Sequence, residues 1–162
     1  MKITTLSVCL LLLSGFTHAQ TNTDPKAMKQ RDSTVMKDIF EPMAAEAVND
    51  NSAPDWNQLK STLTAKYDAA FAERFTWKAK IYFDYSRDWP GFTGALVHYT
   101  NTYEDQNDLK LLNKNAGMIL KYATDPKALE AALGWSKKTV EKEPGNADYK
   151  KTYDALAAKT GK

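Results

Sequence analysis

Residues 55–63 read Asp-Trp-Asn-Gln-Leu-Lys-Ser-Thr-Leu, and the pattern of this segment returns twice later in the chain. An aspartate is followed by apolar residues four and eight positions later, and the same order occurs at 88–96 and 125–133. The offsets between the three segments are 33 and 37 residues. Apolar residues at this spacing share one face of a helix, and an aspartate just before them caps its start. The pattern therefore predicts three related amphipathic helices.

The segments between these helices also repeat. Residues 79–88 align with residues 116–125 at the same offset of 37. Three- and four-residue apolar spacing continues along the rest of the chain, and no comparable stretch alternates with a period of two, so we expect an all-α fold without a sheet. The apolar stripes comprise Met28, Val35, Met36, Ile39, Phe40, Met43 and Ala47; Trp56, Leu59 and Leu63; Tyr67, Phe71, Phe75, Ile81, Tyr82 and Tyr85; Trp89, Phe92, Leu96, Tyr99 and Tyr103; Leu109, Leu112, Ala116, Ile119, Leu120 and Ala123; Leu129, Ala132, Leu133, Ser136 and Val140; Tyr149, Tyr153, Leu156 and Ala157.

Helix starts are marked by capping residues. Asp24-Pro25 and Asp125-Pro126 each place a capping carboxylate before a proline, which is favourable at the first helical position. The other predicted starts are Asp88, an Asp105/Asp108 capping box and Asn146, which follows Pro144-Gly145. Because the connections are short, successive helices should pack antiparallel.

A period of about 34 residues with one helical hairpin per unit is typical of tetratricopeptide repeats. Residues 135–162 resemble the end of one such repeat and the first helix of the next, with Ala132, Pro144 and Gly161 at its small, terminal-proline and closing-glycine positions. More specifically, residues 128–162 resemble the helical repeat segment of exported bacterial thioredoxin-like proteins, and the resemblance extends more weakly back to Trp56. It implies a TPR-like α-α superhelix of about three hairpins plus a C-terminal capping helix. Chance similarity among amphipathic helices is the alternative.

The resemblance covers the scaffold only. A thioredoxin domain carries a Cys-x-x-Cys pair within a βαβ pattern, and neither occurs here. The large aromatic that usually begins a repeat is replaced by Ala116 in the unit that starts at residue 113, so the repeats are degenerate. Redox activity is therefore not carried over, although an association with envelope thiol-redox proteins remains an expectation.

The first residues have the three-part form of a secretory signal peptide. Lys2 precedes an apolar run over 6–16, and Ala19 offers a cleavage site with Gln20 as the new N-terminus. We therefore expect a signal peptide at 1–19 and a single helical domain at 20–162, with an N-terminal helix at 20–50 and repeats at 55–162. Cys9, the one cysteine, would be removed, leaving no thiol and no disulfide. The predicted location is the periplasm or the medium, with no stable membrane insertion after cleavage.

Composition excludes several functions. The 162 residues carry 22 basic and 20 acidic side chains, a net charge of +2, which argues against nucleic acid as a partner. His98 has no cysteine or histidine partner at metal-ligand spacing, and we expect it to face solvent on a repeat helix. Neither a phosphate loop nor a nucleophile elbow occurs. The sequence thus predicts no catalytic residue, no metal and no cofactor.

The tryptophans and lysines suggest a binding face. Trp56 and Trp89 lie on apolar stripes and are expected in the core, whereas Trp77 and Trp135 lie beside theirs. In the repeat register, the first helix of each pair lines an inner groove. The predicted groove residues are Trp77, Lys80, Asp84, Lys114, Lys121, Asp148 and Lys151. An aromatic ring with several lysines suits an acidic peptide or a carboxylate end.

The function predicted from these features is a non-catalytic, exported module that binds a protein or peptide. Three alternatives stay open. The lysines and Trp77 could form an ordinary solvated face; the chain could be an enzyme or small-ligand binder with a cleft that no motif reveals; or it could be an envelope protein that associates with itself.

Overall fold

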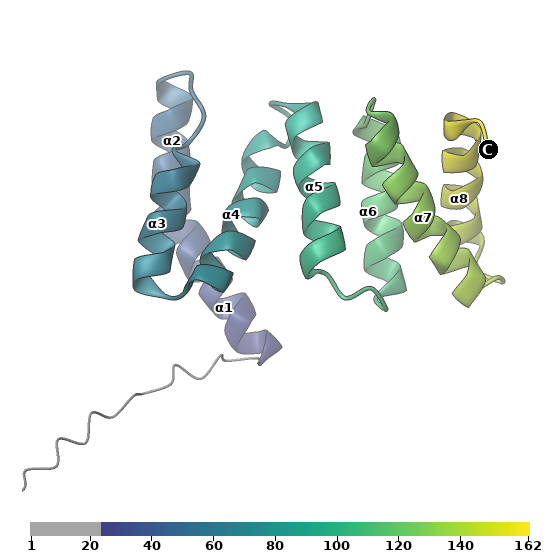
Figure 1. Cartoon of the computed structure of the whole chain (residues 1–162), viewed down its shortest axis with the longest axis horizontal. Coiled ribbons are helices and arrows are strands. Elements are labelled where there is room, and N and C mark those ends of the chain that lie inside the picture. Colours follow the sequence, from purple (N-terminus) through teal and green to yellow (C-terminus); the bar gives the residue numbers. More distant parts are fainter. Residues whose placement is uncertain (1–23) are drawn as a thin grey trace, which may run out of the picture.

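The computed structural model describes residues 24–162, which fold into helices that run alternately up and down (Figure 1). The helices are α1 (Pro25–Val35), the π-helical turn η1 (Met36–Phe40), α2 (Glu41–Asn49), α3 (Trp56–Lys66), α4 (Ala69–Asp84), α5 (Trp89–Tyr103), α6 (Leu109–Tyr122), α7 (Pro126–Lys142) and α8 (Ala147–Thr160). No strand occurs within this part of the chain, so the predicted all-α fold is confirmed. The proposed signal peptide and Cys9 lie outside the described residues.

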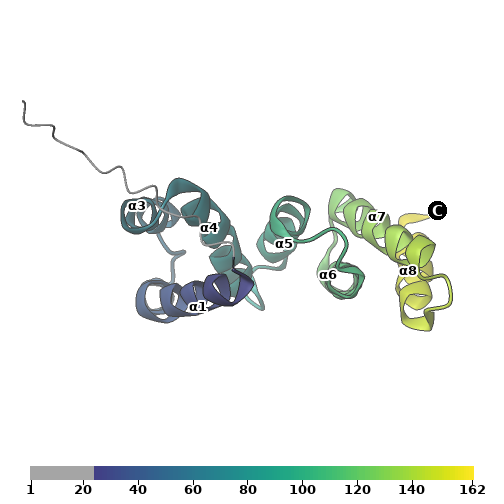
Figure 2. The same ribbon diagram turned by 90° about the horizontal axis from the view of Figure 1, so that it is seen from below.

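The helices form two layers, which are clearest along the view of Figure 2. In the C-terminal half, α5 packs against α7 and α6 packs against α8, while α6 and α7 join the layers. In the N-terminal half, α4 packs against α3 and α5, and α1 lies across from α3 and α4. No helix of residues 24–162 has the combined length and apolarity that a membrane crossing needs.

Two hydrophobic cores lie side by side along the array. The N-terminal core collects buried residues from α1 to α4, with Phe40, Leu59 and Phe75 at its centre. The C-terminal core collects residues from α5 to α8, including Phe92 and Ile119. Burying such side chains removes apolar surface from water, which is the main stabilising term available to this helical array.

Residues from 25 to 49 form one long helix interrupted by η1. Pro42 explains the interruption, because proline has no N–H to donate and its ring crowds the carbonyl four residues earlier. Glu41 N–H instead donates to Met36 O, one residue further back than in an α-helix. Val35, Phe40 and Ala47 are buried in the N-terminal core, so this segment packs on the helices that follow it, as expected from its stripe.

Most predicted caps are present. Asp24 accepts a hydrogen bond from Lys26 N at 3.0 Å, and Asp125 accepts one from Lys127 N at 3.2 Å. Asn146 accepts from both Asp148 N and Tyr149 N. Gly161 ends α8 with a φ of 71°, the left-handed conformation in which glycine has no steric penalty.

Two caps were predicted wrongly. Asp88 stands at the N-cap position of α5, but its side chain makes no capping hydrogen bond. The Asp105/Asp108 capping box does not form, because α6 begins later: Asp108 is the N-cap and accepts from Leu111 N at 2.9 Å, while Asp105 closes a separate turn by accepting from Asn107 N.

The apolar stripes were wrong at three aromatic residues. Tyr82 and Tyr85 were assigned to the core, yet their side chains are 61% and 44% exposed. Trp135 was placed beside its stripe, yet it is buried, and its indole N–H donates to Asn101 Oδ1 at 2.8 Å. A helical wheel assigns directions around one helix only, and the neighbouring helices decide which of those directions are covered.

Candidate interaction surface

Trp77 and Lys80 belong to a packed group of side chains where α3, α4 and α5 meet, which we call the indole junction: Trp56, Trp77, Lys80 and His98. The Trp77 ring stacks on the His98 imidazole with centroids 4.0 Å apart. Lys80 Nζ lies 4.7 Å from the Trp77 centroid and 5.6 Å from that of Trp56, a cation–π arrangement with both rings. His98 is therefore half-buried against an indole. The prediction that it faces solvent is wrong.

A carboxylate completes the indole junction. Glu73 accepts a hydrogen bond from Trp77 Nε1 at 3.0 Å and forms a salt bridge with Lys60 of α3. These contacts, led by the one with Lys60, lower the pKa of Glu73. Because the Trp77 ring and the Lys80 ammonium are already engaged with their neighbours, this group holds α3, α4 and α5 together and leaves little free for a ligand.

The other predicted groove residues do not join that group. Asp84 is half-buried at the end of α4, with its Oδ2 pointing at the first turn of α5 beside Gly91. Burial, and then the charge of Asp88, raise the pKa of Asp84. Lys114 and Lys121 are exposed on α6, and the exposed Asp148 and Lys151 lie on α8.

The main packing partners of α4 differ from those of α6 and α8. The register places these three helices side by side, but α4 packs between α3 and α5, while α6 packs against α8 (Figure 2). Of the predicted set, the structure brings together Trp77 and Lys80, and it places Lys121 beside a second aromatic group that was not predicted.

That second group consists of two pairs of side chains, Val48 with Tyr82 and Tyr85 with Tyr122, which follow each other at the C-terminal end of α4 and which we call the tyrosine strip. Val48, Tyr82 and Tyr85 are the exposed large hydrophobic residues within residues 24–162, at 46%, 61% and 44%. Val48 of α2 and Tyr82 of α4 line a hollow that Ala44, Phe83 and Arg87 complete.

The other end of the strip is anchored on α5 and α6. Tyr122 stacks on Trp89 with centroids 3.9 Å apart and ring planes within 5° of parallel, and Tyr85 meets both rings edge-on. Lys121 Nζ lies 4.9 Å from the Tyr122 centroid. Polar contact with Lys121, and then with Tyr85, lowers the pKa of the Tyr122 phenol. The rings are thus held by packing while their outer edges remain open.

Sequence reasoning placed the tyrosines in the core and so missed this surface. The available signal was the residue type: the stripe of α4 uses phenylalanine at 71 and 75 but tyrosine at 82 and 85. Tyrosine presents an apolar body with a polar tip and is enriched at interfaces. The change from phenylalanine to tyrosine marks the point where the face of α4 leaves the core.

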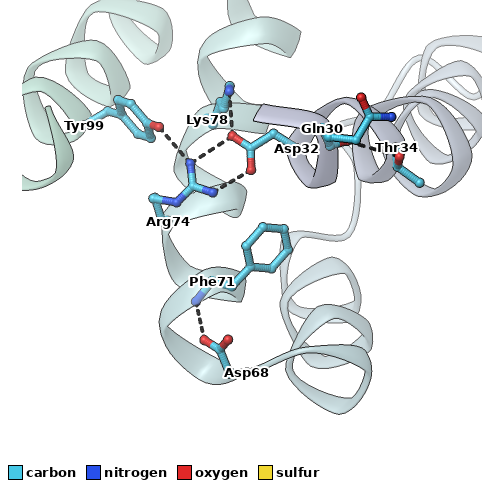
Figure 3. Close-up of polar contacts among 8 residues, drawn as sticks. All are labelled: Gln30, Asp32, Thr34, Asp68, Phe71, Arg74, Lys78 and Tyr99. Atoms are coloured by element: carbon cyan, nitrogen blue, oxygen red, sulfur yellow. Dashed lines mark hydrogen bonds and ion pairs between the residues drawn. The ribbon is translucent and has the colours of Figure 1, made fainter. Parts of the chain in front are cut away.

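A buried ion cluster connects α1 to α4 and α5 (Figure 3). Asp32 is the only charged residue that is buried within residues 24–162. Its carboxylate accepts hydrogen bonds from Arg74 and from Lys78 Nζ, the latter at 2.7 Å, and Arg74 Nη1 also donates to Tyr99 Oη at 3.2 Å. Both oxygens of Asp32 are therefore occupied, and the cluster has a structural role.

Groups suited to metal binding are not found in the described part of the chain, where histidine, aspartate and glutamate do not gather in threes. The arrangement that can act on another molecule is the tyrosine strip, which offers aromatic edges, hydroxyls and two adjacent cations. No protein-family model matches this chain, and the searches of curated proteins and of solved structures likewise found no match.

Proposed function

We propose that this protein is an exported, non-catalytic helical-repeat module of degenerate tetratricopeptide type, and that it binds a partner protein through the tyrosine strip. This function is the one predicted from the sequence, but the binding face is the tyrosine strip and not the predicted groove of Trp77, Lys80, Asp84, Lys114, Lys121, Asp148 and Lys151. The arrangement of the helices in two layers, and the short loops between antiparallel neighbours, support the repeat assignment.

The exposure of Tyr82 carries this proposal. Tyr82 lies on an apolar stripe but is 61% exposed, so it loses the stabilisation of burial. It lines a hollow together with the exposed Val48, and the exposed Tyr85 follows three residues later. Exposed apolar side chains that gather in one place mark interaction sites, and tyrosine is among the residues that dominate binding energy. Tyr85 and Tyr122 are already packed against Trp89, so little ordering of these two rings is needed on binding.

Affinity capture tests this proposal. The chain from Gln20 onward would serve as bait for an envelope extract, and wild type would be compared with Tyr82→Ser/Tyr85→Ser. We expect one partner protein to be recovered in an amount proportional to the amount of wild-type bait. The double variant should not recover it. Because both tyrosines are exposed, the double variant should retain its helical circular dichroism signal; its melting temperature should fall through the lost aromatic contacts of Tyr85 with Trp89 and Tyr122, so capture is compared at matched folded concentration.

Trp77→Ala is the matched control, since it removes an aromatic side chain of α4 from the other face. Its thermal stability should fall slightly. At an equal concentration of folded bait, it should still capture the partner. If Trp77→Ala abolishes capture and the tyrosine variant does not, the binding face is the indole junction and the proposed surface is wrong.

The proposed export has its own test. The full chain would be expressed in a bacterium, fractionated, and the intact mass of the product measured. We expect periplasmic or secreted protein beginning at Gln20. Full-length chain confined to the cytoplasm would contradict this part of the proposal.

A further inference from the structure

A cation lies at each end of the tyrosine strip. Arg87 lines the hollow beside Val48 and Tyr82, and Lys121 lies beside Tyr122 at the other end. Within residues 24–162, neither cation forms a salt bridge with a carboxylate. Arg87 acts on the charge of Asp84 only from beyond ion-pair distance, so both cations keep donor groups that an anion from outside the chain can bind.

Arg87 is held in place by its own contacts. Its Nη1 donates to Phe83 O at 2.9 Å, and its guanidinium lies 4.9 Å from the Phe83 ring centroid. The remaining guanidinium N–H groups point away from that carbonyl and can donate to a carboxylate in a fixed geometry. An arginine positioned before binding loses less side-chain entropy when a partner arrives.

Nearby carboxylates are directed elsewhere. Asp84 and Asp88 are close to Arg87 in sequence, but their Oδ2 atoms converge on the first turn of α5, where a Cβ added at Gly91 would meet them at 2.9 and 2.4 Å. Asp84 is also partly buried. The strip therefore keeps a cation at each end while these two negative charges face the start of α5.

We propose that the tyrosine strip binds a segment of a partner protein that has apolar side chains in its middle and carboxylates on both sides. This inference rests on the proposed function, because it names the partner chemistry for the same surface. The apolar side chains contact Val48, Tyr82 and Tyr85, and the carboxylates pair with Arg87 and Lys121. Opposite charges at the rim fix the register of the bound segment and raise its association rate.

Peptides of defined composition test the charge assignment. Three fluorescent peptides would share a Leu-Phe-rich centre and differ in their ends, which are acidic, neutral or basic. Binding to the full chain would be followed by fluorescence anisotropy. We expect the acidic-ended peptide to bind about tenfold or more tightly than the neutral one, and this difference should shrink as ionic strength rises.

Charge reversal provides the decisive comparison. Arg87→Glu/Lys121→Glu should lose the acidic-ended peptide and gain the basic-ended one, whereas Lys127→Glu/Lys151→Glu, which makes the same charge change at exposed sites on α7 and α8, should retain the wild-type order. Tyr82→Ser should weaken all three peptides. Circular dichroism of each variant checks that it is folded.

Several outcomes would overturn the inference. If the three peptides bind equally, or if the basic-ended peptide binds best, the strip does not select carboxylates, although capture dependent on Tyr82 could still hold. If no peptide binds, the inference fails as well. Sedimentation that shows a dimer lost on Tyr82→Ser would identify the occupant as a second copy of this chain.

Discussion

Arg74 of α4 donates to both carboxylate oxygens of Asp32 on α1, with Nη1 2.9 Å from Oδ2 (Figure 3). The two residues are 42 positions apart in the chain. Lys78 and Tyr99 complete the cluster, so one buried carboxylate organises side chains from three helices. This contact ties α1 to α4 and, through Arg74, to α5.

Replacing Asp32 by Asn should destabilise the fold. The change leaves the mostly buried Arg74 guanidinium without a counter-charge, and breaking such a pair from one side costs about 3 kcal/mol. Chemical denaturation at neutral pH measures this loss. Asp38→Asn is the control, because Asp38 lies on the same N-terminal segment but is exposed, and it should change stability by less than about 0.5 kcal/mol. Equal effects of the two variants would show that the cluster contributes no net stability.

The same cluster predicts a dependence on pH. Burial tends to raise the pKa of Asp32, but hydrogen bonds from Arg74 and Lys78 outweigh it and the folded-state pKa is lowered. The stability that Asp32 contributes is thus fully present above its unfolded pKa of about 3.9 and is lost as the pH falls through the lower folded pKa. Denaturation curves of wild type and Asp32→Asn, measured from neutral to acidic pH, should therefore converge in acid. A constant difference down to the lowest pH would contradict the charge assignment.

The sequence predicted the helices well because their signals are local. Caps such as Asp24 and Asn146, and spacings such as Leu59 to Leu63, depend on residues a few positions apart. The contacts that define surfaces are not local. Whether Tyr82 is covered depends on where α2 ends, and the stacking of Trp77 on His98 depends on how α5 lies against α4.

Charged residues show the same limit. In the sequence, Asp32 resembles an ordinary polar position within the apolar stripe of its helix. Its partners Arg74 and Lys78 are more than 40 positions away, so no local pattern identifies its role. The predicted groove residues have a related limit: the repeat offset gave the order of the helices but not that α4 packs on α3 and α5. Single helices could be predicted, whereas the candidate site required the packing between them.

Trp135 offers a test of one packing contact. Its buried indole donates to the exposed Asn101 on α5, so it links α7 to α5. Trp135→Phe should cost about 1–3 kcal/mol through the lost hydrogen bond and the space left in the core. Asn101→Ala should cost less, since water can reach the position of the amide. In a double-mutant cycle, a coupling energy near zero would mean that the hydrogen bond does not stabilise the α5–α7 contact.

Asp88→Asn should stabilise the protein at neutral pH. Asp88 occupies the N-cap of α5 without a capping hydrogen bond, and its charge faces that of Asp84 near Gly91. Asparagine caps helices as well as aspartate does, and removing one of two like charges should gain about 0.5 kcal/mol. Because burial and Asp88 both raise the pKa of Asp84, Asp84 becomes neutral as the pH falls through that raised value, and the advantage of the variant should disappear there.

Asp125→Asn is the matched control at an N-cap that does bond Lys127 N, and no gain is expected for it. Thermal melts across the acidic range separate the two explanations, since an advantage of Asp88→Asn that persists in acid would arise from capping and not from charge.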